Sequence, residues 1–135
     1  MPQVVTCLLL QNDKLLILKR SQKVHTYKGL WGGVAGYIEE YEKPYETALK
    51  EIQEETGLNQ TQIIFIKQGQ PETINDIYEG TTYEWIIHPF VFKLKPKTAI
   101  HIDWEHTEYQ WIKPKDIQTY KTVPHFKEIV QKHLL

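Results

Sequence analysis

The chain has 135 residues, a formal net charge of −1 and one cysteine, Cys7. This length predicts a single domain over residues 1–135 that can bury a core without disulfides or metal staples. The balanced charge argues against a nucleic-acid polymer as the partner, because such binding draws on a strongly basic surface.

The N-terminal third is predicted to form strands. Residues 4–10 and 15–18 are apolar runs that flank turn-forming residues at 11–14, a pattern that predicts a β-hairpin. Residues 19–29 are polar without periodicity and predict a loop. Residues 30–38 predict a short strand interrupted by glycines.

A helix is predicted over residues 44–56. Pro44 suits its first position, where the missing N–H is harmless, and Gly57 suits the position just past its end. On a helix of 3.6 residues per turn, Glu51, Glu54 and Glu55 are expected to share one face. The opposite, packing face is expected to carry Tyr45, Ala48, Leu49 and Ile52.

The remaining elements follow from apolar periodicity. Strands are predicted at 63–67, 82–94 and 108–112, a helical turn at 115–118, and an amphipathic helix at 124–134. Pro89 is expected to mark an edge or a bulge of its strand, and residues 68–80 are expected to be a polar loop. This order of elements predicts an α/β protein, with a mixed β-sheet covered by helices on both faces.

The cysteine and the hydropathy of the chain predict its compartment. Cys7 lies in an apolar run and has no partner for an internal disulfide, which predicts a buried, inert thiol in a reducing environment. No stretch has a signal-peptide pattern or the apolar length of a bilayer span. We therefore expect a cytoplasmic protein without membrane association.

The segment from Gly36 to Leu58, GYIEEYEKPYETALKEIQEETGL, has fixed residue types at fixed spacings. Five residues separate Gly36 from Glu42, and seven more separate Glu42 from the run at 50–58. This pattern resembles the signature box of the Nudix hydrolases, and only Lys50 departs from it, where the family usually has arginine. The resemblance implies the Nudix fold, an α/β/α sandwich with a mixed β-sheet.

The resemblance also implies a chemistry. Nudix hydrolases cleave the pyrophosphate linkage of a nucleoside diphosphate linked to a group X, by attack of water at phosphorus, with Mg²⁺ or Mn²⁺ as the cofactor. Hard oxygen ligands suit these ions. The resemblance assigns metal binding to Glu51, Glu54, Glu55 and the backbone carbonyl of Gly36.

Two further positions of the box are expected to support these ligands. Glu42 matches a glutamate that either shapes the loop before the helix or touches the metal through water. Lys50 stands where the family's arginine orients a helix glutamate, and lysine cannot reproduce the planar fork of arginine. We expect Lys50 to supply positive charge near Glu42, Glu46 or Glu54.

The general base has several candidates. In the family it is either a box glutamate, here Glu51 or Glu54, or a glutamate on a later loop. Glu105, six residues before Trp111, resembles that loop glutamate. Asp103 and Glu84 are weaker alternatives, and an ordinary surface carboxylate is the competing interpretation of Glu105.

Substrate contacts are predicted near the end of the first hairpin. Lys19 and Arg20 could reach phosphate oxygens, although surface charge is the common fate of such a pair. Tyr27, Trp31 and Trp85 could stack on a ring of the substrate, with core packing as the alternative.

The predicted partner is a small nucleoside diphosphate derivative, and the C-terminal helix could face a second copy in a homodimer. The first alternative function is a nucleotide sensor that keeps the fold without hydrolysis. An isomerase or a cap-directed hydrolase on the same scaffold stays open as well. ADP-ribose, dinucleoside polyphosphates, nucleoside triphosphates and nucleotide sugars are all candidate substrates.

Overall fold

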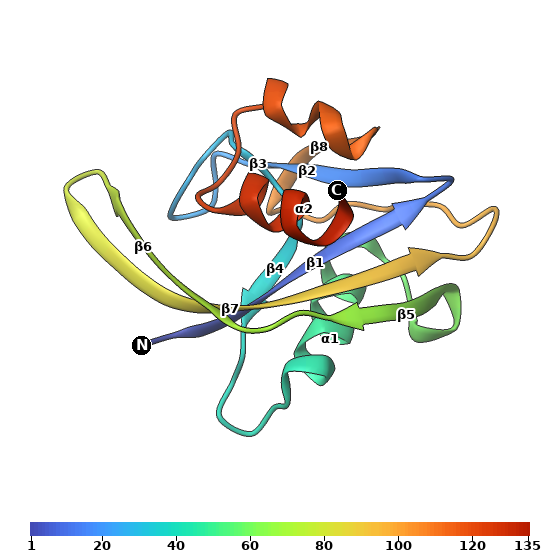
Figure 1. Ribbon diagram of the computed structural model, residues 1–135, viewed down its shortest axis with the longest axis horizontal. Coiled ribbons are helices and arrows are strands. Elements are labelled where there is room, and N and C mark those ends of the chain that lie inside the picture. The colour runs from blue at the N-terminus through green and yellow to red at the C-terminus, as the bar shows by residue number, and fades with distance from the viewer.

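The computed structural model describes every residue from Met1 to Leu135, and its centre is an eight-stranded sheet (Figure 1). The strands are β1 (Gln3–Gln11), β2 (Lys14–Arg20), β3 (Trp31–Gly32), β4 (Val34–Tyr37), β5 (Ile63–Gln68), β6 (Glu72–Tyr78), β7 (Thr81–Leu94) and β8 (His106–Ile112). The helices are α1 (Pro44–Thr56) and α2 (Phe126–Leu134), with 3₁₀ turns η1 (Gln60–Gln62) and η2 (Pro114–Thr119).

The sheet is mixed, as the order of elements predicted. β1 runs parallel to β7, whereas the other strand pairs are antiparallel. On its other side β1 pairs with β4 along its first half and with β2 only at its end. The divergence of β4 from β2 leaves room beside β1 for the side chains of a site.

The predicted first hairpin is confirmed. Asn12 and Asp13 join β1 to β2, and both have positive φ angles, 52° and 62°. A two-residue turn with both φ angles positive matches the twist of the flanking strands, and Asn and Asp tolerate that conformation.

Helices cover both faces of the sheet, so the predicted α/β/α sandwich is confirmed. α1 contributes Ala48 and Ile52 to one buried cluster, together with Val5 and Phe92 from the sheet. α2 packs against the opposite face, where its buried residues join those of β1, β2 and η2. The N-terminal half of β7 pairs with β6 in a hairpin that extends beyond the rest of the sheet in Figure 1.

The ends of α1 agree with the prediction, but the placement of one glutamate does not. Pro44 occupies the first turn and Gly57 adopts a left-handed conformation, φ 76°, directly after the helix. The expectation that Glu55 lies on the face opposite the packing residues Ala48 and Ile52 is wrong. Glu55 lies on the buried stripe that follows Ala48 and Ile52, and it is only 1% exposed.

The predicted loop over residues 68–80 is also wrong, because most of it forms β6. This strand pairs with β7 in continuous register, and Glu79 and Gly80 close the turn with positive φ angles. The burial of its side chains alternates, but their apolar character does not: the less exposed positions include Glu72 and Asp76, and Ile77 is exposed, so the sequence lacks the alternation that identifies a strand.

Pro89 lies inside β7, paired with β1, at the point where the neighbour on the other side changes from β5 to β6. Its carbonyl accepts a hydrogen bond from Gly69 between those two strands. Proline is tolerated there because its missing N–H faces a break in the ladder. The irregularity of register lies in β5, between Phe65 and Lys67, and not in β7 itself.

Two smaller predictions concern burial and length. Cys7 is buried in the core, as expected, and burial followed by the charges of Glu55 and Glu51 raises the pKa of its thiol well above the usual value. The model contains no helix with the length and apolar character needed to cross a bilayer.

Candidate active site

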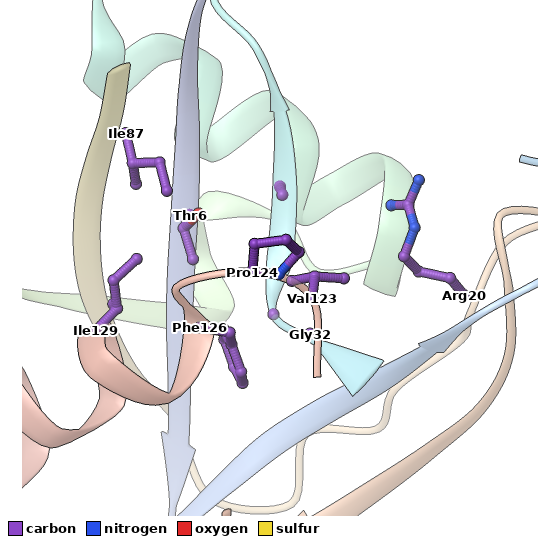
Figure 2. A pocket seen from close by; sticks show the side chains of 10 residues that line it. Thr6, Arg20, Gly32, Ile87, Val123, Pro124, Phe126 and Ile129 are labelled. Carbon is purple, nitrogen blue, oxygen red and sulfur yellow. The ribbon is translucent and has the colours of Figure 1, made fainter. Parts of the chain in front are cut away.

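A cleft of about 550 Å³ opens beside the N-terminal half of β1. Its floor includes Val4, Thr6 and Ile87 from β1 and β7, and its walls come from β4, the loop after β2, the β6–β7 hairpin and the loop before β8. A small cavity adjoins it, and Figure 2 shows Thr6, Pro124 and Phe126 lining that cavity together with Arg20. The volume of the larger cleft is in the range of small-molecule binding sites.

The carboxylates of α1 reach the cleft past β4. Glu51 lines the cleft, and Glu55 lies beneath, where its Oε1 accepts a hydrogen bond from the Ala35 N–H at 3.4 Å. A methyl group added at Gly36 would overlap the Glu51 side chain, so glycine is what lets this carboxylate lie directly against β4. The glycine at position 36 therefore allows the Glu51 side chain of α1 to pack directly on the β4 backbone.

The Glu51 and Glu55 carboxylates are both harder to ionise than usual. Burial, the charge of Glu54 and a hydrogen bond shared with Glu54 raise the pKa of Glu51 to about 7. Burial, Glu51 and Glu105 raise the pKa of Glu55 well above its usual value. These carboxylates are close enough to oppose one another's ionisation, which is the arrangement expected of a site that receives positive charge.

Glu105 belongs to the same acidic group although it lies about fifty residues away along the chain. Burial raises the pKa of Glu105, as do the charges of Asp103 and Glu54, whereas Arg20 acts in the opposite direction. The Glu105 carbonyl accepts a hydrogen bond from the Ser21 N–H at 2.7 Å, which ties this loop to the end of β2. Glu105 also lines the cleft.

Arg20 is the cation of the cleft. A register shift between Lys19 and Arg20 turns the end of β2, and the Arg20 Nε donates a hydrogen bond to the Thr26 carbonyl at 3.0 Å. Burial lowers the pKa of Arg20, while Glu105 and Glu55 raise it. The terminal guanidinium nitrogens make no hydrogen bond within the chain and are free to donate to a ligand.

The remaining box residues connect the middle of α1 with the loop that precedes the helix. The Lys50 Nζ is 2.7 Å from Glu42 Oε2. Glu42 Oε1 accepts hydrogen bonds from the Glu39 N–H and the Thr47 hydroxyl, both at 3.1 Å. Of the three carboxylates named for Lys50, it therefore pairs with Glu42, which fastens the preceding loop to the helix.

Two predicted substrate contacts lie outside the cleft. Lys19 pairs with Glu108 across β2 and β8, Nζ to Oε2 3.4 Å, and Trp31 packs edge-on against Tyr120 with ring centroids 5.6 Å apart. Tyr27 and Trp85 do line the cleft. Of the three residues predicted to contact the substrate, Arg20 lines the cleft, whereas Lys19 and Trp31 do not.

The weaker candidates for the general base are placed differently from Glu105. Asp103 Oδ1 is 3.0 Å from His106 Nδ1, so its carboxylate is already engaged by a buried imidazole. Glu84 lines the cleft from β7 and is exposed.

Several residues of the site were not foreseen. The His106 Nε2 lies 3.8 Å from Glu55 Oε1. The sequence gives only one local signal for His106, which is that Asp103, its other partner, precedes it by three residues. Further residues at the cleft are Val24, His25, Tyr37, Tyr83, Trp104, Val123 and Pro124. They come from five separate segments, and only the fold brings them together.

The donors present fit a hard divalent cation. Glu51, Glu54 and Glu55 offer only oxygen, the ligand type that Mg²⁺ and Mn²⁺ prefer. Glu55 Oε2 is buried without a hydrogen-bond partner, a costly state for a carboxylate that a bound cation would relieve. No group of three or more His, Cys, Asp or Glu side chains is gathered closely enough to hold a metal ion by side chains alone.

Comparison with known proteins gives a consistent result. The family described as the NUDIX domain matches residues 1–133. The nucleoside triphosphatase NudI of Escherichia coli O139:H28 is 25% identical over 126 residues, which is 87% of this chain and 86% of that protein.

Solved structures show the same fold. The dihydroneopterin triphosphate pyrophosphohydrolase of E. coli superposes with a TM-score of 0.81 at 17% identity, covering 98% of this chain and 94% of that one. The NUDIX domain of Shewanella oneidensis NrtR, crystallised with ADP ribose, gives 0.75 at 20% identity, covering 98% and 88%. At these identities the likeness establishes the fold alone.

Proposed function

The chain belongs to the NUDIX domain family of pyrophosphohydrolases, and on this premise we propose that it hydrolyses the phosphoanhydride linkage of a nucleoside triphosphate or another nucleoside diphosphate derivative with the help of Mg²⁺ or Mn²⁺. The name of the relative NudI favours a nucleoside triphosphate. The ADP ribose in the NrtR structure supports nucleotide derivatives as the wider ligand class.

The observation that carries the proposal is the buried, unpartnered Glu55 Oε2 beside the raised pKa of Glu51. A protein gains no stability from carboxylates that oppose one another's ionisation at the edge of a cleft. A divalent cation would satisfy both groups. We therefore assign Glu51, Glu54, Glu55 and the Gly36 carbonyl to hold the ion.

When bound, the metal ion would neutralise the phosphate oxygens and the charge that develops on them during displacement. Arg20 has the same task from the end of β2, because its free guanidinium nitrogens can donate to a phosphate oxygen. Thr26 holds the guanidinium in place for that contact. Glu42 and Lys50 keep the start of α1 against the loop that precedes it.

We assign the general base to Glu105, with Glu51 and Glu54 as the box candidates. Glu105 lines the cleft within electrostatic reach of Glu54 and Arg20, and burial raises its pKa, which makes it a stronger base than an exposed carboxylate. Its role is to take a proton from the attacking water, so that the phosphorus–oxygen bond to the leaving group can break.

A hydrolysis screen tests the proposal. The panel comprises nucleoside triphosphates, dinucleoside polyphosphates, ADP-ribose and nucleotide sugars, each with Mg²⁺ and with a chelator. Wild type, Glu54→Gln and Glu128→Gln are compared, because Glu128 is an exposed carboxylate on α2.

We expect release of phosphate, pyrophosphate or a nucleoside monophosphate that requires both the metal and Glu54 and is unaffected by Glu128→Gln. Activity that persists in the chelator, or in Glu54→Gln at the wild-type rate, would contradict the proposal. Tight nucleotide binding without turnover of any substrate would favour the sensor alternative.

A further inference from the structure

Trp104 differs from the other three tryptophans of the chain. Trp31 and Trp85 pack against other aromatic rings, and Trp111 packs against the core cluster beneath α1. Trp104 is 62% exposed, belongs to neither core cluster and has no aromatic partner. It nevertheless lines the cleft. An indole at the border of a ligand site offers a large, flat apolar surface on which a ring of the ligand can stack.

The turn that carries Trp104 is held in place from both ends. The His106 imidazole, only 7% exposed, is hydrogen-bonded to Asp103, and the His106 N–H donates to the Asp103 carbonyl at 3.2 Å. The Glu105 carbonyl is bonded to the Ser21 N–H. The backbone beneath Trp104 is thus ordered before any ligand arrives, which reduces the entropy lost on binding.

Tyr37 also lines the cleft and is exposed, but it carries a phenol ring and not an indole, whereas the other aromatic side chains there are engaged with their neighbours. The Tyr27 ring lies 4.5 Å from that of Tyr78, and its hydroxyl donates to Asp76 at 2.8 Å. Trp85 packs against Tyr27 and Tyr83, each with centroids 6.4 Å away. Trp104 is therefore the indole whose faces are free.

We propose that Trp104 binds an aromatic ring of the substrate by stacking, so that one rigid turn presents a recognition surface next to the candidate base Glu105. This inference rests on the proposed function and narrows it. Trp104 and Glu105 are consecutive residues, so the ring of the substrate, a nucleobase or another heteroaromatic group, would bind next to the phosphate that is attacked. A diphosphate that bears only a sugar or an alkyl chain would gain nothing from Trp104.

The test compares Trp104→Ala, Trp104→Phe and the control Tyr109→Ala, an aromatic residue of β8 that is 41% exposed and does not line the cleft. ATP, GTP, CTP and UTP serve as ring-bearing probes, and inorganic tripolyphosphate serves as the ring-free probe. Initial rates give kcat and KM for each, and stopped-flow tryptophan fluorescence reports binding before turnover.

We expect Trp104→Ala to raise KM for the preferred nucleotides by about tenfold with kcat unchanged, within the range that a base stacked on an aromatic side chain contributes. Trp104→Phe should retain most of the affinity, and both variants should lose the fluorescence quenching that nucleotides cause in wild type. With tripolyphosphate, the kinetics of Trp104→Ala should match those of wild type. Tyr109→Ala should match wild type with every substrate.

Unchanged KM and quenching in Trp104→Ala would overturn the inference. So would an equal rise of KM for tripolyphosphate, since Trp104 would then support the loop and not a ring. The fluorescence titration does not depend on turnover. If the proposed hydrolysis fails, quenching lost with Trp104 would still support the ring contact.

Discussion

The Lys50 ammonium lies 2.7 Å from Glu42 Oε2, while the other oxygen of Glu42 binds the Glu39 N–H and the Thr47 hydroxyl. The carboxylate thus joins the loop to α1 at two points, Lys50 and Thr47, and braces the loop itself through Glu39. Lysine fills a position where the family usually has arginine, and one ammonium contact is sufficient for this purpose.

Replacing Lys50 with arginine should therefore preserve or raise turnover. A guanidinium can reach Glu42 and adds a second donor for it. Lys50→Met, which removes the charge, should reduce metal affinity or kcat by about ten- to a hundredfold, the usual effect of losing an outer group, because Lys50 ties Glu42 to α1 and its charge acts on the proposed ligand Glu51. Steady-state kinetics check both variants, and a large loss in Lys50→Arg would mean that Lys50 has another role.

Gly36→Ala should separate folding from activity. A methyl group there would overlap the Glu51 side chain from its Cγ to its carboxylate, so this half-buried side chain must turn away from β4, and the thermal midpoint should change little because the turned side chain can reach solvent. The displaced carboxylate should weaken metal binding by at least about tenfold. In Gly32→Ala the added methyl meets only the two methyl groups of Val123, at 3.2 and 3.7 Å, and metal binding should be kept. Equal metal affinities in the two variants would argue against Glu51 as a ligand.

The stability of the metal-free protein should depend on pH through Glu51. Its pKa is about 7 in the folded chain, against a usual value of 4.5. The folded state holds the proton where the unfolded state has released it, so the free energy of unfolding decreases as pH rises from about 4.5 to 7. The buried Glu55 acts with the same sign.

Thermal midpoints in a chelator should accordingly fall over that interval, and Glu51→Gln should flatten the profile because its amide does not titrate. Differential scanning calorimetry at several pH values measures this. A wild-type profile that coincides with that of Glu51→Gln would show that Glu51 does not titrate in this range.

Glu105→Gln should lower kcat by about 10²- to 10⁴-fold with a small change in KM, the effect of removing a positioned general base. Glu84→Gln is the matched control, because Glu84 also lines the cleft but lies on the exposed β6–β7 hairpin. A fully active Glu105→Gln would exclude this residue and leave Glu51 or Glu54 as the base. Rapid-quench kinetics at saturating metal distinguish these outcomes.

Local signals explain which elements the sequence predicts well. The ends of α1 depend on Pro44 and Gly57, and the first hairpin depends on Asn12 and Asp13, so each is determined by neighbouring residues. β6 was missed because just one of its side chains is buried and its pairing with β7 supplies most of its stability.

The site is harder to predict because its geometry depends on contacts between distant segments. The box spacing identifies the glutamates, yet the burial of Glu55 arises from Ala35 on β4 and His106 on β8. The register shift that separates Arg20 from Lys19 is likewise a property of the β2–β8 pair. The sequence identifies the residue types of the site, whereas only the fold shows which side chains point into the cleft.

Binding of Mn²⁺ followed by electron paramagnetic resonance tests the central claim most directly, that the α1 carboxylates hold a divalent cation. Wild type and Glu55→Gln should be compared, since the amide keeps the shape of the side chain without its buried charge. We predict that wild type binds Mn²⁺ and is thermally stabilised by it, whereas Glu55→Gln is more stable than wild type without metal and gains nothing from Mn²⁺. Equal Mn²⁺ affinity in the two proteins, or no binding to wild type even with a nucleotide present, would contradict the account.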